Sequence, residues 1–371
     1  MASINKDHLK EGRRMFQRHL AVRGKYFRRF DGDANNITKS IVSQLYNGLF
    51  YRTSLGHYPH FYSRDFGMMV PSLLDLGKKK EAISTVNYAL DRYERDGGIK
   101  TFINVSGKPV NFPNVYSPDS VVHMFRAVGI LNNKEINDRY RNFLQQEVYK
   151  FYDTAIFKIT GEIKRHIHFG GMRDHSKRDS SCYDTVMAGV ISREANALGL
   201  DNPLDRFDYS EILLKDYWTG AYFRDDKSSK LLSADANIYP FWYGVVDDMS
   251  YQRTAIESMQ ALDLDKPFPI KYVANNSQKG KTIFVEKLSS GWQSDAIWPM
   301  SALPFIDLVS DVDLRQAKAY LRQYRDLIET HKNFLEVFDS KGRPYKSSVY
   351  SCDEGMIWSA LYLSLAKRFK M

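Results

Sequence analysis

The sequence is poor in cysteine and lacks any long apolar run. Only Cys182 and Cys352 occur among 371 residues, too few for a disulfide framework, so we expect a reducing, cytoplasmic setting. No run of 18 apolar residues is present, so we predict no transmembrane helix and no membrane partner. Residues 1–8 do not place a basic segment before an apolar one, which argues against a secretory signal. With 43% hydrophobic and 26% charged residues, the composition is typical of a globular protein.

Motifs for nucleotide, cofactor and metal binding are missing as well. Residues 280–282 read Gly-Lys-Thr, but Asn275 stands where a phosphate-binding loop needs glycine. No dinucleotide-type glycine fingerprint and no Gly-x-Ser-x-Gly elbow occurs. His166 and His168 could share one face of a strand, yet nothing fixes the three or four converging ligands that a metal needs. We therefore expect no cofactor and no metal.

Positive charge is concentrated at the N-terminus. The net charge is +9 overall and +7 within residues 1–30, which hold nine basic and two acidic residues. Helical spacing puts Phe16 and Leu20 on one face, so we expect a basic amphipathic helix over 1–30. Such a helix can bind nucleic acid or an anionic membrane. Charge runs are more often solvated faces, so we expect this helix to pack on the body and predict no nucleic-acid partner.

Helical periodicity dominates the rest of the chain. About twelve helices are predicted, which pair into six helical hairpins, and no short repeat of the tetratricopeptide or ankyrin kind marks them. Strand-like patterns are short, at 161–169, 281–285 and 334–338. Long polar loops, for example 218–243, separate the helices and are typical of functional segments. We expect one all-α domain over 1–371.

Acidic residues stand beside aromatic ones at five predicted junctions between a loop and a helix. The junctions are 62–66, 116–119, 181–184, 291–295 and 351–354. Helix capping explains any one of them, because Asp and Ser favour helix N-termini. In a toroid of helices, however, alternate helix starts point toward one end, so these carboxylates would converge on one cleft. A cleft of carboxylates and aromatic rings suits carbohydrate, which needs charged hydrogen-bond partners and apolar faces.

Several segments occur in a characteristic order. They are 62–65 with 70–77, 115–120, 181–184 with 192–198, 291–299, 334–338 and 357–361. Together they resemble the six-hairpin glycosidases, in particular the glucoamylases and the glucosidase domain of glycogen debranching enzymes. The first segment resembles an Arg-Asp motif that holds the terminal sugar, the third resembles the segment of the general acid, and the last two resemble the region of the general base.

The resemblance implies an (α/α)6 toroid and an exo-acting, inverting glycoside hydrolase for α-glucosidic linkages of an oligo- or polysaccharide. It implies Asp184 as general acid and Glu336 as general base, with Glu354 as an alternative base. Inverting enzymes place these two groups ~6.5–9.5 Å apart. The substrate-binding residues implied are Tyr62, Arg64, Asp65, Asp119, Trp292 and Trp358.

Two other classes of function stay open. Related toroids include invertase-like hydrolases, mannosidases, phosphorylases, epimerases and lyases, because one fold hosts many functions. A non-catalytic carbohydrate-binding protein needs only aromatic walls and one anchoring pair, whereas an enzyme needs Asp184 and Glu336 in one pocket. A carbohydrate is the expected partner in each of these enzyme and binding functions, and the sequence leaves the sugar, the linkage and the oligomeric state open.

Overall fold

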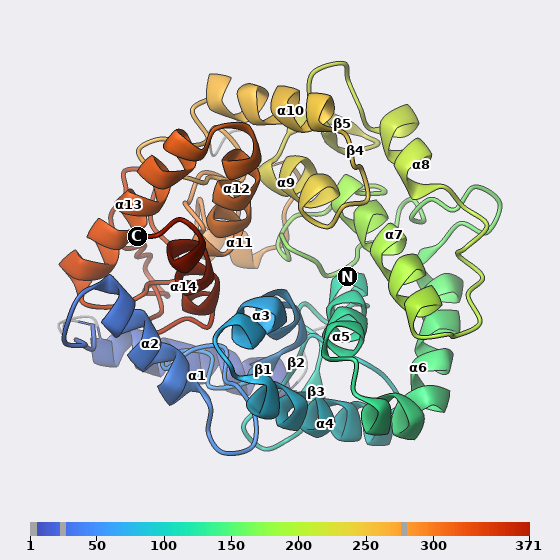
Figure 1. The fold of residues 1–371 in the computed structure, drawn as a ribbon, viewed down its shortest axis with the longest axis horizontal. Coiled ribbons are helices and arrows are strands. Elements are labelled where there is room, and N and C mark those ends of the chain that lie inside the picture. The colour runs from blue at the N-terminus through green and yellow to red at the C-terminus, as the bar shows by residue number, and fades with distance from the viewer. Residues whose placement is uncertain (1–5, 23–26, 276–279) are drawn as a thin grey trace.

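A computed structural model describes residues 6–22, 27–275 and 280–371, and within these ranges twelve helices form two concentric rings (Figure 1). The inner ring contains α3 (Ser63–Asp75), α5 (Pro118–Leu131), α7 (Cys182–Ala197), α9 (Ala234–Trp242), α12 (Pro299–Val312) and α14 (Ser359–Arg368). The outer ring contains α2 (Ala34–Leu45), α4 (Lys79–Asp96), α6 (Lys134–Ala155), α8 (Tyr209–Asp216), α10 (Met249–Ala261) and α13 (Leu314–His331).

The inner ring is closed. Each inner helix contacts the next one, and the last inner helix, α14, contacts the first, α3. Each outer helix packs on the inner ring, as α4 does on α3 and α5. This arrangement confirms the expected all-α (α/α)6 toroid. None of the helices in the described ranges is long and apolar enough to cross a membrane.

The residue pattern of each helix determines its ring. In the outer helix α13 the buried residues recur on one face and the other face is solvated, as expected for an amphipathic helix. The inner helix α5 buries residues on all sides, which is typical of a helix inside a core. Gly67 allows α3 and α5 to approach closely, because a Cβ atom there would lie 2.4 Å from the backbone oxygen of His123.

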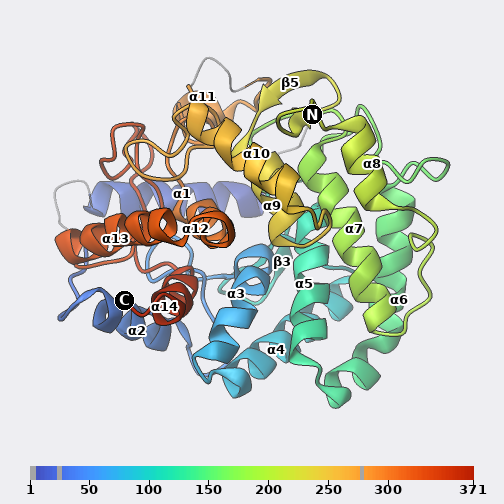
Figure 2. The same ribbon diagram turned by 45° about the horizontal axis from the view of Figure 1, so that its top comes forward.

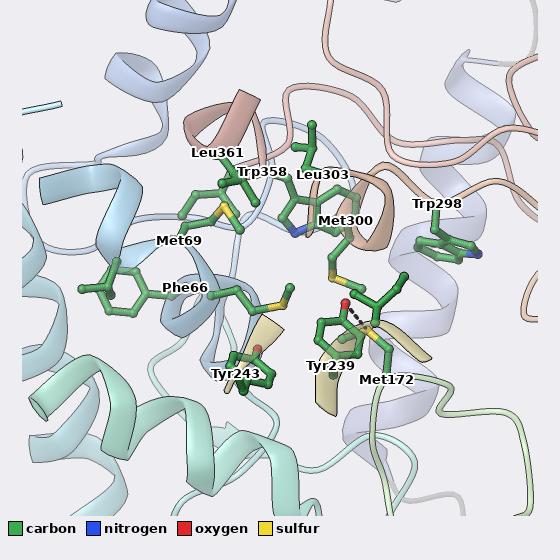
Figure 3. Close-up of a cluster of buried hydrophobic side chains, with 14 of the residues drawn as sticks. Phe66, Met69, Met172, Tyr239, Tyr243, Trp298, Met300, Leu303, Trp358 and Leu361 are labelled. Atoms are coloured by element: carbon green, nitrogen blue, oxygen red, sulfur yellow. Dashed lines mark hydrogen bonds between the residues drawn. The ribbon is translucent and has the colours of Figure 1, made fainter. Parts of the chain in front are cut away.

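Apolar and aromatic side chains fill the middle of the inner ring (Figure 3). Those labelled in the figure are Phe66, Met69, Met172, Tyr239, Tyr243, Trp298, Met300, Leu303, Trp358 and Leu361, all of them buried. They come mainly from α3, α9, α12 and α14.

The strands are short and lie in the loops. β1 (Phe61–Tyr62), β2 (Phe102–Ile103) and β3 (Pro109–Val110) form an antiparallel sheet, and β4 (Arg224–Asp226) pairs with β5 (Ser229–Leu232). The strands predicted at 161–169, 281–285 and 334–338 are wrong, because those segments make only isolated bridges. These segments are irregular loops: 334–338 is buried throughout, whereas 281–284 contains no buried residue.

Two regions of helix differ from the prediction. The expected loop 218–243 contains α9, which the sequence hides because Pro240 lies inside a nine-residue helix. α14 begins at Ser359, later than the helix start predicted at 351–354, because Glu354 forms a bridge with Leu335 and Gly355 takes a positive φ of 66°.

The N-terminal helix also differs from the expectation. α1 (Lys6–Val22) is shorter than the predicted helix 1–30: residues 1–5 and 23–26 lie outside the described residues, and 27–30 are not helical. It lies outside the two rings, and in Figure 2 it passes behind α12 and α13. Phe16 and Leu20 are 42% and 51% exposed, so the apolar face does not pack on the body as amphipathicity predicts. The reason is that charged residues of α1 bind charged or polar residues of the two rings and their loops, such as Glu354 and His60.

Candidate active site

Side chains from the first turns of the inner helices contact one another at one end of the ring. Arg64 of α3 places Nη1 3.2 Å from Oδ2 of Asp119 in α5. The Tyr183 hydroxyl of α7 donates to the same carboxylate at 3.4 Å. Trp358, which precedes α14, donates its indole N–H to Oδ1 of Asp65 in α3 at 2.9 Å. Residues from four distant segments therefore meet, as the convergence of helix starts predicts.

The Arg64 guanidinium is the centre of this group. Besides Asp119, it lies 3.6 Å from Asp174 and 3.9 Å from Asp65, and it donates to the backbone oxygen of Gly171 at 2.6 Å. Three carboxyl groups thus surround one cation. Burial raises the pKa of Asp174 to about 6 even though Arg64 opposes the rise. The excess of carboxylate oxygens offers acceptors for sugar hydroxyls.

Asp184 lies in the first turn of α7. The Ser181 hydroxyl caps the helix by accepting the Asp184 N–H at 3.0 Å and donates to Asp184 Oδ2 at 2.5 Å. Oδ1 is buried with no hydrogen-bond partner among the described residues. Burial raises the pKa of Asp184 to about 6, Asp119 adds to the rise, and Arg178 and Ser181 oppose it. The group therefore keeps its proton to a higher pH than an ordinary aspartate does, and it titrates near pH 6.

A buried ionic network lies beside Asp184, and the sequence analysis missed it. Arg178 contacts Asp235 at 2.7 Å and Asp225 at 3.6 Å, and Arg173 lies 3.1 Å from both oxygens of Asp225. Asp235 stands in the first turn of α9, the helix that was not predicted. Recognising that helix would have added Asp235 to the acidic helix starts. The arginines belong to a loop whose path the sequence does not reveal.

Glu336 is 2% exposed and lies in the segment between α13 and α14. Its Oε2 accepts hydrogen bonds from the Tyr350 hydroxyl at 2.7 Å and from the Asp353 N–H at 2.9 Å. Burial, followed by the charges of Asp353 and Asp65, raises the pKa of Glu336 well above its usual value. Glu336 is thus within electrostatic reach of Asp65, which pairs with Arg64.

The aromatic candidates lie next to these groups. The Trp292 ring packs edge to face against Tyr350, with ring centroids 4.5 Å apart, so it stands beside the partner of Glu336. Trp298 donates its indole N–H to the Trp292 backbone oxygen at 2.7 Å. Tyr62 stacks on Phe102 with centroids 4.9 Å apart, and the negative charge of Asp65 is felt at its hydroxyl.

Glu354 has other partners. Its Oε1 accepts from Arg18 of α1 at 2.7 Å, and its Oε2 accepts from the backbone N–H of Arg28 at 2.5 Å and from Asn333 at 3.1 Å. α1 is further held where Glu11 contacts His60 at 2.9 Å. The Glu354 carboxylate therefore fastens the N-terminal segment, and none of these bonds joins it to the other candidates.

Asp184 and Glu336 are connected through the residues between them. Asp184 lies within electrostatic reach of Asp119, which Arg64 binds, and Arg64 also pairs with Asp65, whose charge reaches Glu336. The predicted site residues thus belong to one contiguous group, with Glu354 at its edge, because Arg18 lies 2.7 Å from Glu354 and 3.8 Å from Asp353.

Across 6–22, 27–275 and 280–371, no three His, Cys, Asp or Glu side chains are grouped so that they could hold a metal ion. Both cysteines are free and buried, and burial raises the pKa of each thiol well above its usual value. Such thiols are poor nucleophiles.

No protein-family model matches this sequence, and neither does any curated protein. Solved structures share the fold. A glycosidase variant in complex with glucose matches at TM-score 0.65 and 12% identity, over 99% of both chains. The GH63 mannosylglycerate hydrolase from Thermus thermophilus matches at 0.60 and 12%, over 90% of this chain and 100% of that one. A rhamnosidase from Klebsiella oxytoca with rhamnose bound matches at 0.63 and 10%, over 92% of this chain and 65% of that one.

At these identities the likeness concerns the fold. The chain thus has the toroid fold that these glycosidases share, and it spans about two thirds of the length of the rhamnosidase.

Proposed function

We propose that this protein is a glycoside hydrolase in which Asp184 is the general acid and Glu336 the general base. The observation that supports this most strongly is the pair of buried carboxyl groups, from distant segments, joined through Asp119, Arg64 and Asp65 at one end of the ring. Glycosidases need one carboxyl that keeps its proton and one that activates water. The glycosidases that share the fold favour the same conclusion.

In the proposed reaction, Asp184 transfers its proton from Oδ1 to the glycosidic oxygen, and the bond between this oxygen and the anomeric carbon breaks. Glu336 removes a proton from a water molecule whose oxygen bonds to the opposite face of that carbon. The configuration is therefore inverted, and the two carboxyl groups would stand ~6.5–9.5 Å apart. Asp184 ends ionised and Glu336 protonated, and one proton returned through water restores the starting state.

The raised pKa values of Asp184 and Glu336 mean that the two groups compete for protons. The productive form carries its proton on Asp184 and none on Glu336. The rate should therefore rise with pH as Glu336 ionises and fall as Asp184 loses its proton, which gives a bell-shaped profile.

We propose exo action on an α-glucosidic linkage. Apolar side chains pack in the middle of the ring, and we expect them to prevent a polymer from passing through it, which favours entry by a chain end. Arg64, Asp65 and Asp119 would bind the hydroxyls of the terminal sugar, and Tyr62, Trp292 and Trp358 would form the walls. Mannosylglycerate and rhamnose, named with the structures that share the fold, are the sugars to test beside α-glucosides.

A carbohydrate-binding protein without hydrolytic activity is the second candidate. The raised pKa of Glu336 favours it, because a protonated carboxyl cannot activate water. The two candidates differ in whether any glycoside is turned over.

The test is a hydrolysis screen over α-glucans, sucrose, trehalose, mannosylglycerate and rhamnosides, with the released anomer followed by proton NMR. We expect the anomer opposite to that of the substrate. Asp184→Asn and Glu336→Gln should each lose about 10²–10⁴-fold in kcat, whereas Glu354→Gln should keep its turnover. Full activity in Glu336→Gln together with loss in a folded Glu354→Gln would transfer the base role to Glu354.

A further inference from the structure

One tyrosine hydroxyl and one backbone N–H donate to a single oxygen of Glu336, and a second tyrosine contacts the first. The hydroxyls of Tyr58 and Tyr350 are 2.9 Å apart, and Tyr350 donates to Glu336 Oε2 at 2.7 Å. The Asp353 N–H donates to the same oxygen at 2.9 Å. Among the described residues no donor reaches Oε1, so the two carboxylate oxygens stand in different environments.

The direction of these bonds follows from proton counting. A tyrosine hydroxyl carries one proton. When Glu336 is a carboxylate it can only accept, so Tyr350 gives its proton to Oε2 and must accept from Tyr58. The donor chain therefore runs from Tyr58 to Tyr350 to Glu336. Donation by the first hydroxyl polarises the second and strengthens its bond to the carboxylate.

The surroundings hold this donor chain in place. The Asp353 carboxylate accepts the backbone N–H of His57 at 2.7 Å and that of Tyr58 at 3.3 Å, so one residue fixes both the segment of Tyr58 and the base. The Tyr350 ring packs on His57, with centroids 4.8 Å apart. These contacts leave the ring of Tyr350 little freedom to turn its hydroxyl away.

We propose that Tyr58 and Tyr350 are positioning residues. Tyr350, supported by Tyr58, holds Oε2 of Glu336 by a hydrogen bond, and Oε1 is thereby presented to the attacking water. The proposal rests on the role of Glu336 proposed above, which it deepens. The charges facing the carboxylate are those of Asp353 and Asp65, with Arg18 3.8 Å from Asp353. Both carboxylates disfavour ionisation of Glu336, and the Tyr350 hydroxyl and the Asp353 N–H oppose them.

Removing one hydroxyl at a time tests the donor chain. Tyr350→Phe keeps the ring and loses the donor that lowers the pKa of Glu336, so this pKa should rise by about one unit. Tyr58→Phe should raise it less, since it only weakens the Tyr350 bond. Tyr140→Phe is the control, because its hydroxyl donates to the backbone oxygen of Asn87 at 3.4 Å, on the outer ring.

The measurement is the titration of the Glu336 carboxyl carbon by ¹³C NMR in resting protein labelled at glutamate, with the resonance assigned through Glu336→Gln. The expected order of midpoints is wild type and Tyr140→Phe lowest, Tyr58→Phe next and Tyr350→Phe highest. An unchanged midpoint in both Tyr58→Phe and Tyr350→Phe overturns the proposal. If Tyr350→Phe does not fold, the midpoint of Glu336 in Tyr58→Phe alone tests the proposal: a higher midpoint than in wild type supports it, and an unchanged one overturns it.

This readout needs no substrate, so it separates the two proposals. A protein that hydrolyses nothing but shows the ordered midpoints loses the proposed function and keeps the donor chain. In an active protein, the acid limb of the kcat/KM profile should move to higher pH in the same order, with the KM little changed.

Discussion

Replacing Asp184 with asparagine should stabilise the protein while it abolishes the proposed general acid. Burial raises the pKa of Asp184 from the ordinary 3.8 to about 6, so the folded state binds this proton more tightly than the unfolded state does. Folding stability is then lost as pH rises from 3.8 to about 6, and the loss is complete above that range. The asparagine side chain in Asp184→Asn has no proton to lose and would escape the penalty.

The size of this stability penalty follows from the difference between the pKa of Asp184 in the folded and in the unfolded state. At 1.36 kcal/mol for each pKa unit, ionising Asp184 costs the folded state about 3 kcal/mol at pH 8 and about 1.5 kcal/mol at pH 5. The advantage of Asp184→Asn over the wild type should therefore grow by about 1.5 kcal/mol between these two values. Titrating groups that do not interact with Asp184 are common to both proteins and cancel in the difference.

The assay is urea unfolding of wild type, Asp184→Asn and the control Asp138→Asn at pH 5 and pH 8. Asp138 is exposed on the outer helix α6, so its variant should follow the wild type at both values. A difference between Asp184→Asn and wild type that is the same at both pH values, or that shrinks at pH 8, would refute the reasoning.

Three further substitutions probe the same site. Ser181→Ala removes the helix cap and a hydrogen bond that lowers the pKa of Asp184, so urea unfolding should show a loss of about 1 kcal/mol and the alkaline limb of kcat/KM should move to higher pH. Gly171→Ala would place a methyl group 3.3 Å from Asp184 Oδ1, so kcat should fall while the melting temperature stays close to that of the wild type. An unchanged kcat would show that the leaving group does not bind at Oδ1. Trp358→Phe leaves buried Asp65 without its indole donor, which should cost about 1–3 kcal/mol in urea unfolding and raise the KM.

Much of the fold could be predicted because helix periodicity is local. The outer helices show their apolar face at regular spacing, and capping residues such as Asp313, which accepts the N–H of Gln316, mark where they begin. The closed ring then aligns the starts of the inner helices. That is why Arg64, Asp65 and Asp119, each found at a predicted helix start, lie together.

The rest depends on contacts between distant segments. Tyr350 and Arg178 lie in loops, and only the folded chain brings them to Glu336 and Asp235. The orientation of α1 was mispredicted because its ion pair with Glu354, 336 residues away, outweighs its apolar face. No local pattern contains that information.

The central claim is that Asp184 and Glu336 stand on opposite sides of one sugar. A crystal structure of the protein with glucose bound tests it most directly. The account predicts the anomeric carbon between the two carboxyl groups, ~6.5–9.5 Å apart, with Arg64 and Asp65 at the far hydroxyls. Glucose seated elsewhere, or with either carboxyl out of reach of the anomeric carbon, would contradict the account.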